Sequence, residues 1–202
     1  MIAASQSPKI THRLKVALVG DTGVGKTSVS TRFACGDFDP YQTSTIGAAY
    51  LTKLLERPDY NVRFEIWDTA GQERYKALVP LYYRTAQVIL VVLDLTAAAS
   101  VHEAKSWLQR AAKEPGNRKI LLVGNKADDA RRRRVTRDQL EALGADHDSA
   151  VFEVSAKTGD GISALFDAAA DAAPTLASNR AAMGTTTLPF EEKTDDWASC
   201  CG

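Results

Sequence analysis

The feature that most restricts how this chain can fold is an eight-residue segment near its beginning, Gly20-Asp21-Thr22-Gly23-Val24-Gly25-Lys26-Thr27. The segment matches the pattern G-x-x-x-x-G-K-[ST] and follows an apolar run from Leu14 to Val19. Glycines allow a backbone to wrap around a phosphate chain with its N–H groups pointing inward. We therefore expect a strand, a phosphate-binding loop and a helix in succession.

Two side chains at the end of this segment have defined chemical uses. The Lys26 ammonium can reach the β- and γ-phosphates of a nucleotide, and the Thr27 hydroxyl can ligate Mg²⁺. The N-terminus of the following helix, expected from Lys26 to about Cys35, adds positive potential. The alternative is a chance match in a glycine-rich turn, which average residue frequencies place in roughly 1% of chains of this length.

The rest of the chain alternates apolar strands with amphipathic helices. Strands are expected at 14–19, 47–55, 62–67, 88–93, 120–123 and 151–154, and further helices at about 101–111, 136–143 and 162–169. The second and third strands flank the turn signal at 57–60, so they form a hairpin. This order predicts an α/β fold with a six-stranded, mostly parallel sheet and helices on both faces. Ligands of such sheets bind at the carboxyl ends of the strands.

Composition separates a main domain from two ends. The 25 Lys and Arg balance the 25 Asp and Glu, so no bulk charge favours a nucleic-acid partner. No apolar run approaches the ~20 residues that span a bilayer, and the first 12 residues lack a signal-peptide core, so we expect a cytosolic protein. We expect a flexible N-terminus over 1–11, one domain over 12–174, and a disordered tail over 175–202. Three cysteines, Cys35, Cys200 and Cys201, make a disulfide framework implausible.

A second motif, Asp68-Thr69-Ala70-Gly71-Gln72, follows the strand that ends at Trp67. A carboxylate at Asp68 can bind Mg²⁺ directly or through water. Gly71 permits close approach of the backbone to a terminal phosphate, and Gln72 can orient an attacking water. Taken alone, D-x-x-G is also a common turn pattern.

The third and fourth motifs concern the base. In Asn125-Lys126-Ala127-Asp128, the Asp128 carboxylate can accept two hydrogen bonds from guanine, a donor pair that adenine lacks. The Lys126 stem can lie over the base, and a backbone N–H of Ser155-Ala156-Lys157 can meet the guanine O6. Each segment alone could be a polar loop. Four motifs in series, each at a strand end, predict a guanine-nucleotide site.

The order and spacing of these motifs resemble the Ras-like small GTPases over residues 12 to about 174. The run from Trp67 to Tyr75 followed by Tyr82-Tyr83-Arg84 is similar to the Rab family, and the runs 44–50 and 125–128 are similar to its early-endosomal branch. The resemblance implies the P-loop GTPase fold and a GTP hydrolase that cycles between GDP and GTP states. It also implies that the GTP state recruits effectors to endosomal membranes in vesicle trafficking and fusion.

The resemblance also implies residue roles. Two loops, about 37–48 and 68–82, sense the nucleotide. Thr45 reaches Mg²⁺ and the γ-phosphate, Phe38 packs across the guanine, and Gln72 with Lys26 carries catalysis. The implied Mg²⁺ ligands are Thr27, Thr45 and Asp68. The implied nucleotide contacts are Asp21, Thr22, Gly23, Val24, Gly25, Lys26, Thr27, Ser28, Phe38, Thr45, Gly71, Asn125, Lys126, Asp128, Ser155, Ala156 and Lys157. Thr22-Gly23 stands where many early-endosomal members carry Ser-Ala, a difference that bears on the hydrolysis rate and not on GTP binding.

The effector surface implied by the resemblance comprises Ile46, Tyr50, Trp67 and Tyr82. For Trp67 the alternative is an ordinary core or scattered surface position. The four arginines Arg131 to Arg134 are interpreted as a solvated loop, with a partner or lipid contact as the alternative.

The chain ends in Cys200-Cys201-Gly202, which resembles the double-cysteine Rab ending that receives two geranylgeranyl groups. Two lipid chains give stable anchoring where one does not. The alternative is a pair of unmodified thiols. The implied partners of this monomer are an exchange factor, an activating protein, effectors, Rab escort protein and GDP dissociation inhibitor. The implied location is the cytoplasmic face of endosomal membranes, with plasma or vacuolar membranes as alternatives.

Two other functions compete with a GTPase switch. An ATP-dependent P-loop kinase is disfavoured by the Asn125 to Asp128 motif. A non-hydrolysing membrane tether is disfavoured by the complete set Lys26, Thr27, Thr45, Asp68 and Gln72.

Overall fold

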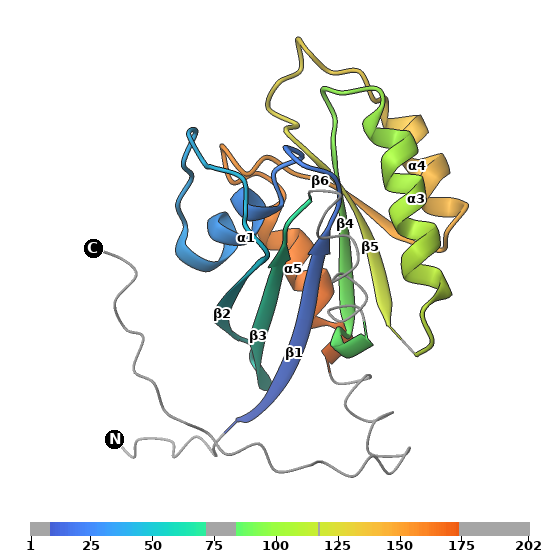
Figure 1. The fold of residues 1–202 in the computed structure, drawn as a ribbon. Helices are drawn as coiled ribbons and strands as arrows, with labels where there is room; N and C mark the ends of the chain where they lie inside the picture. The colour runs from blue at the N-terminus through green and yellow to red at the C-terminus, as the bar shows by residue number, and fades with distance from the viewer. Residues whose placement is uncertain (1–8, 72–83, 117, 174–202) are drawn as a thin grey trace.

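A six-stranded sheet forms the centre of the molecule (Figure 1), seen in a computed structural model that describes residues 9–71, 84–116 and 118–173. Its strand order is β2-β3-β1-β4-β5-β6. Only the β2–β3 pair is antiparallel, so the predicted mostly parallel sheet is confirmed. The strands are β1 (Ile10–Val19), β2 (Ala48–Glu56), β3 (Tyr60–Thr69), β4 (Val88–Asp94), β5 (Lys119–Asn125) and β6 (Ala150–Glu153).

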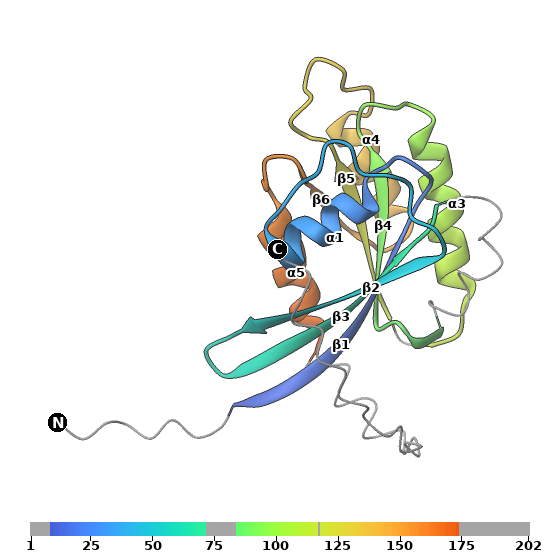
Figure 2. The same cartoon turned by 60° about the vertical axis from the view of Figure 1, so that its left-hand side comes forward.

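Helices cover both faces of the sheet. The described helices are α1 (Lys26–Cys35), α3 (Ser100–Lys113), α4 (Arg137–Ala145) and α5 (Ile162–Ala170). Helices α1 and α5 lie on one face, and α3 and α4 lie on the other (Figures 1 and 2). In the described part of the chain, no helix has the length and apolarity needed to cross a membrane.

Each face of the sheet has its own apolar core. Under α1 and α5, the rings of Phe33 and Phe166 stack at 3.7 Å between centroids, and both meet the edge of Phe64. Under α3 and α4, Trp107 and Leu108 pack among aliphatic side chains of β1, β4 and β5. Large, fully buried aromatic and aliphatic groups in both layers supply the main driving force for folding.

The strand β1 begins at Ile10, four residues before the predicted start at Leu14. Residues 10–13 pair in parallel with Tyr60 to Arg63 of β3. Figure 2 shows the first part of β1 and the adjoining ends of β2 and β3 extending beyond the helices. Because this pairing joins distant parts of the chain, the polar residues at 11–13 gave no local strand signal.

The predicted hairpin and helix ends agree with the structure. The Arg57 N–H donates to the Tyr60 carbonyl at 3.0 Å and closes the turn between β2 and β3. Gly36 ends α1 in the left-handed region at φ 76°. Thr136 caps α4 in a capping box with Gln139. The loops that follow β1, β3, β4, β5 and β6 leave the sheet at one edge, where the four motifs meet (Figure 1).

Candidate functional site

The phosphate-loop motif lies between β1 and α1, as its pattern predicts. Gly20 has φ 141°, and a Cβ there would lie 2.2 Å from the Val92 carbonyl oxygen. Only glycine fits such a close approach of the loop to β4. A cavity of about 130 Å³ lies between this loop, residues 42–45 and Gly71.

Lys26 points into this end of the site and is 5% exposed. Its Nζ donates to the Gly20 carbonyl at 2.9 Å and to the Asp21 carbonyl at 2.8 Å. Burial lowers the pKa of Lys26 to about 8, against the opposing effect of the Asp68 and Asp21 carboxylates. An ammonium that is costly to bury is stabilised by an anion placed beside it, so this position suits a phosphate group.

Three oxygen-bearing side chains converge next to Lys26. The Thr27 hydroxyl lies 2.7 Å from the Thr45 hydroxyl and donates to Asp68 Oδ2 at 2.5 Å. The Thr45 hydroxyl also donates to Asp68 Oδ2, at 3.3 Å. The other carboxylate oxygen, Asp68 Oδ1, is buried without a hydrogen-bond partner. Burial raises the pKa of Asp68, while the Thr27 hydrogen bond and the Lys26 charge oppose the rise.

This donor set fits Mg²⁺. Hydroxyl and carboxylate oxygens are the ligands that a small hard cation prefers, and Mg²⁺ in nucleotide sites usually takes one or two carboxylates together with phosphate oxygens and water. The unpartnered Asp68 oxygen is a buried acceptor that a cation or its water would satisfy. No group of three His, Cys, Asp or Glu side chains gathers anywhere in the described ranges.

Gly71 closes the site from the end of β3. A Cβ at this position would lie 2.6 Å from Lys26 Nζ and equally close to backbone atoms of Asp21 and Thr22. The D-x-x-G segment therefore approaches the phosphate loop as closely as its glycine predicts. Two of the predicted residues, Gln72 and Tyr82, lie outside the described residues.

The other end of the site is a cavity of about 300 Å³ that shares Gly23, Gly25 and Ser28 with the first. Asn125 joins the two ends. Its Nδ2 donates to the Val24 carbonyl at 2.9 Å, and its Oδ1 accepts the Ala156 N–H at 3.2 Å. A Cβ on Gly25 would lie 2.3 Å from Asn125 Nδ2. This amide therefore fixes the phosphate loop against the loop after β6.

Lys126 and Asp128 are also held in place. The Lys126 backbone is left-handed at φ 68°, and its Nζ donates to the Gly23 carbonyl at 2.8 Å and to Asp94 Oδ2 at 2.7 Å. The Ser155 hydroxyl donates to Asp128 Oδ1 at 2.6 Å and leaves the carboxylate exposed along the cavity. The side chain of Ser155 therefore orients Asp128, a role that the backbone-based prediction for this loop did not include.

Phe38 and Lys157 form the outer wall of the same cavity. Arg32 of α1 supports that wall, since its Nε donates to the Ala156 carbonyl and its Nη2 to the Lys157 carbonyl, both at 2.7 Å. Its guanidinium lies 6.0 Å from the centre of the Phe38 ring. Arg32 thereby links the loop after α1 to the loop after β6.

Sequence reasoning missed three supporting residues: Arg32, Asp94 and Trp107. Asp94 ends β4 and accepts from Lys126, and Trp107 of α3 donates to Asp21. Asp94 carried a usable signal, because it follows an apolar strand just as Asp68 does. The other two lie inside helices and belong to no motif.

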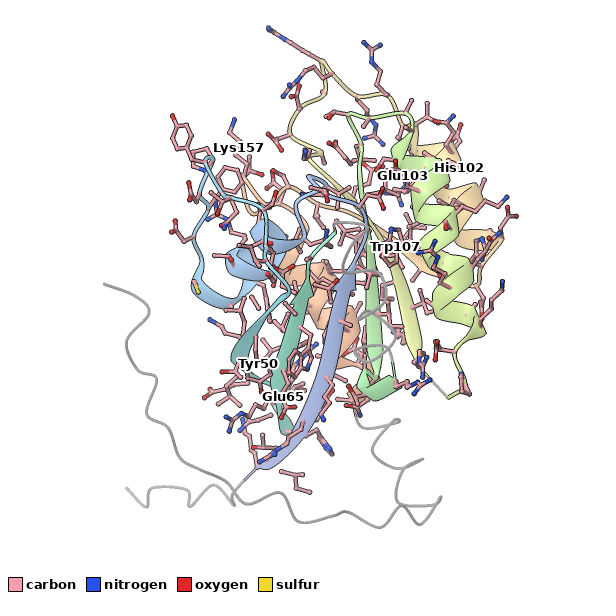
Figure 3. All side chains as sticks on the ribbon, in the orientation of Figure 1. Tyr50, Glu65, His102, Glu103, Trp107 and Lys157 are labelled. Atoms are coloured by element: carbon pink, nitrogen blue, oxygen red, sulfur yellow. The ribbon has the colours of Figure 1, made fainter. Side chains whose placement is uncertain are left out.

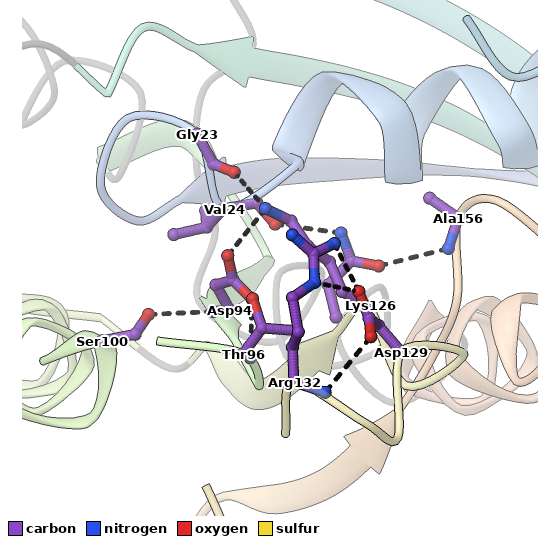
Figure 4. Close-up of polar contacts among 10 residues, drawn as sticks. Gly23, Val24, Asp94, Thr96, Ser100, Lys126, Asp129, Arg132 and Ala156 are labelled. Carbon is purple, nitrogen blue, oxygen red and sulfur yellow. Dashed lines mark hydrogen bonds and ion pairs between the residues drawn. The ribbon is translucent and has the colours of Figure 1, made fainter. Parts of the chain in front are cut away.

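The arginine run is only partly a solvated loop. Arg133 makes a paired contact with Glu153 at 2.8 and 2.6 Å. Arg132 folds onto Asp129 at the rim of the larger cavity (Figure 4). Arg131 and Arg134 are exposed.

The predicted effector surface lies beside this site on β2 and β3. Ile46 is 80% exposed and Tyr50 is 49% exposed. The ring of Tyr50, which is labelled in Figure 3, lies 4.9 Å from the half-buried ring of Trp67. Alternation along β3 thus brings Trp67 to the surface side, next to Tyr50.

The chain is similar in sequence to known proteins. The model of the Ras family matches residues 15–175. The GTP-binding protein ypt5 of Schizosaccharomyces pombe is 46% identical over 178 residues, which cover 86% of this chain and 84% of the relative. The family works with exchange factors, activating proteins and effectors. The chain belongs to the Ras family and is a Rab-type small GTPase that binds guanine nucleotides, hydrolyses GTP and acts in vesicle trafficking.

Proposed function

We propose that this GTPase is a two-state switch of the endosomal membrane, and that the cleft described above reads its nucleotide. The observation that carries the proposal is the convergence of Thr27, Thr45 and Asp68 beside Lys26. These groups come from α1, from the loop before β2 and from β3. A single ligand set built from three separate segments can couple their positions to the state of the nucleotide.

The assigned roles follow from the contacts. Thr27, Thr45 and Asp68 would hold Mg²⁺, which when bound neutralises charge on the β- and γ-phosphates. Lys26 stabilises charge on the transferring phosphoryl group, and Gln72 orients the attacking water. Gly71 admits the terminal phosphate, because its backbone already lies against the phosphate loop.

Base choice is assigned to the larger cavity. Asp128 accepts from guanine, and Lys126 lies along the ring with Phe38 on the outer side. The 155–157 segment supplies a backbone N–H for the guanine O6. The hydrogen bonds of Asn125 and Ser155 hold these groups in position, which lowers the entropy lost on binding.

The tail would attach the switch to a membrane. We propose geranylgeranylation of Cys200 and Cys201, delivery by Rab escort protein, and extraction by GDP dissociation inhibitor. In the GTP state, effectors would contact Ile46, Tyr50, Trp67 and Tyr82. The exposure of Ile46 and Tyr50 supports this surface.

Two substitutions that should shift the equilibrium between the GDP and GTP states in opposite directions test the switch. Gln72→Leu removes the water-orienting group and leaves the metal ligands, so GTP should stay bound. Thr27→Asn disturbs a metal ligand that matters most for the triphosphate, so GDP or the empty state should prevail. Nucleotide content by chromatography and capture of effectors are the readouts. Equal recruitment of effectors by both variants would show a passive tether.

A separate variant tests the anchor. Changing both Cys200 and Cys201 to Ser should move the protein from membranes to cytosol while GDP binding persists, since the tail has no basic cluster to hold an anionic surface. Imaging with an endosomal marker identifies the compartment. Membrane association that survives the double change would point to another anchor.

A further inference from the structure

The phosphate loop has a contact from outside the cleft. Trp107 lies on the sheet-facing side of α3 (Figure 3) and is 3% exposed. Its indole N–H donates to Asp21 Oδ1 at 2.8 Å, across 86 positions of sequence. The indole is a donor only and has one rigid direction. The contact therefore fixes the Asp21 side chain relative to α3.

The same residue is held on its backbone side by the cleft. The Asp21 carbonyl accepts from Lys26 Nζ at 2.8 Å. A Cβ on Gly71 would lie 2.6 Å from the Asp21 carbonyl carbon, so the end of β3 leaves little space for the loop to shift. Asp21 thus connects Trp107 on one side with Lys26 on the other.

The indole itself cannot easily move. Its ring packs in the buried cluster with Ala17, Val19 and Leu108, and the Arg110 guanidinium lies 5.3 Å from the ring centre. A buried indole N–H keeps a partner because leaving it unpaired is costly. A rigid helix and a packed core therefore set the position of the Asp21 side chain.

We propose that Trp107 is a positioning residue for nucleotide binding. Through Asp21 it holds the phosphate loop in the conformation that presents Lys26, so the loop is ordered before the nucleotide arrives. Without this contact, the phosphate loop has more conformational freedom when no nucleotide is bound, so nucleotide binding is weaker. The weaker binding appears mainly as faster release of the nucleotide. The inference rests on the proposed phosphate-binding role of the loop and adds α3 to the parts that control it.

A double-mutant cycle on the full chain with Mg²⁺ tests the coupling. Release of a fluorescent GDP analogue is followed for Trp107→Phe, Asp21→Ala and the combined variant. Trp107→Phe keeps an aromatic ring and removes the N–H, so release should be about fivefold faster, the size expected for one hydrogen bond. Asp21→Ala should accelerate release at least as much. The combined variant should be no faster than Asp21→Ala alone.

A packing control separates positioning from general stability. Leu108→Ala removes volume from the same buried cluster and removes no hydrogen bond to the loop. It should lower the unfolding midpoint of the nucleotide-free protein at least as much as Trp107→Phe, yet leave GDP release within twofold of the parent. Release that follows the unfolding midpoint across all variants would overturn the proposal, and so would factors that multiply in the combined variant.

Lys26→Ala identifies which idea has failed. If Lys26→Ala removes GDP binding while Trp107→Phe has no effect on release, only the role of Trp107 is wrong. If Lys26→Ala leaves GDP affinity unchanged, the proposed phosphate loop is wrong, and the Trp107 inference is rejected with it.

Discussion

The two ends of the cleft are built differently. At the phosphate end, Lys26 and Asp68 are almost fully buried in a cavity of about 130 Å³. At the base end, Asp128 and Lys157 are exposed along a cavity of about 300 Å³. Electrostatic interactions are strong where water is excluded, whereas a hydrogen-bonding edge selects between bases even when it is partly open. Affinity and selectivity are thus assigned to different ends of one site.

The two ends are nevertheless connected. Asn125 and Lys126 belong to the base motif, yet their side chains bond to the Val24 and Gly23 carbonyls of the phosphate loop. A change at one end can therefore alter the other through these two bonds. Four substitutions, taken from the largest expected effect to the smallest, measure how independent the two ends are.

Lys26→Ala should lower the affinity for a nucleotide whichever base the nucleotide carries. It leaves the buried Asp68 carboxylate without its nearby cation and removes a phosphate partner, so GDP affinity should fall about 10³-fold, on the order of 4 kcal/mol. Calorimetric titration with GDP measures the loss. Lys105→Ala, an exposed lysine of α3, is the matched control and should bind normally. A loss below tenfold would contradict the division between the two ends.

Asp128→Asn should affect selectivity. It removes the acceptor for the guanine donor pair, so GDP affinity should fall roughly 10²-fold, about 3 kcal/mol, while the weak affinity for ADP stays as it was. Comparing the GDP-to-ADP affinity ratio of the variant with that of the parent is the measurement. If both nucleotides weaken equally, Asp128 acts on the phosphate end and the base assignment is wrong.

Asp94→Asn tests the connection between the ends. Burial acts to raise the pKa of Asp94, but hydrogen bonds from Lys126 and Thr96 outweigh it and hold the pKa below its usual range. The amide keeps the shape and loses the charge opposite Lys126, so GDP should be released about fivefold to tenfold faster, on the order of 1 kcal/mol. Asp138→Asn on the exposed side of α4 is the control.

The pH dependence of that effect has a definite sign. Because the folded pKa of Asp94 is lowered, its ion pair is fully present above the ordinary pKa of aspartate and is lost only as the pH falls through the folded value. The difference between Asp94→Asn and the parent should therefore be constant between about pH 6 and pH 8. A difference that changes over this range would assign the effect to another group.

Arg133→Gln should have the smallest effect and should not reach the cleft. Its paired hydrogen bonds lower the pKa of Glu153, with burial opposing. The stability that the ionised Glu153 gains from Arg133 is present above the ordinary glutamate pKa and is lost as the pH falls through the folded pKa of Glu153. The free energy of unfolding of the variant should fall by about 1 kcal/mol at neutral pH and by less in acid. GDP release should be unchanged. Thermal unfolding at two pH values measures this, with exposed Arg131→Gln as the control.

The motifs, the six-stranded, mostly parallel sheet and the ends of α1 could be predicted because short-range patterns encode them. Lys26 and Gly36 lie where the helix rules place a start and a stop. The supporting contacts could not be predicted, because Arg32 and Trp107 bond to groups 124 and 86 positions away. No local pattern distinguishes such a side chain from an ordinary helix residue. The early start of β1 was missed for the same reason, since a distant strand supplies its partners.

The described chain begins and ends on the side of the domain opposite the cleft. The first residues of β1 and the end of α5 lie at the lower end in Figure 1, whereas the loops carrying Gly23 and Lys126 lie at the upper end. The 29 residues that follow Ala173 have a maximum extended reach of about 100 Å. If Cys201 carries the proposed lipid, this segment would join the membrane to the side of the domain opposite the cleft. Regulators could then approach the nucleotide from the aqueous side, and the length of the segment would limit the distance between the domain and the bilayer.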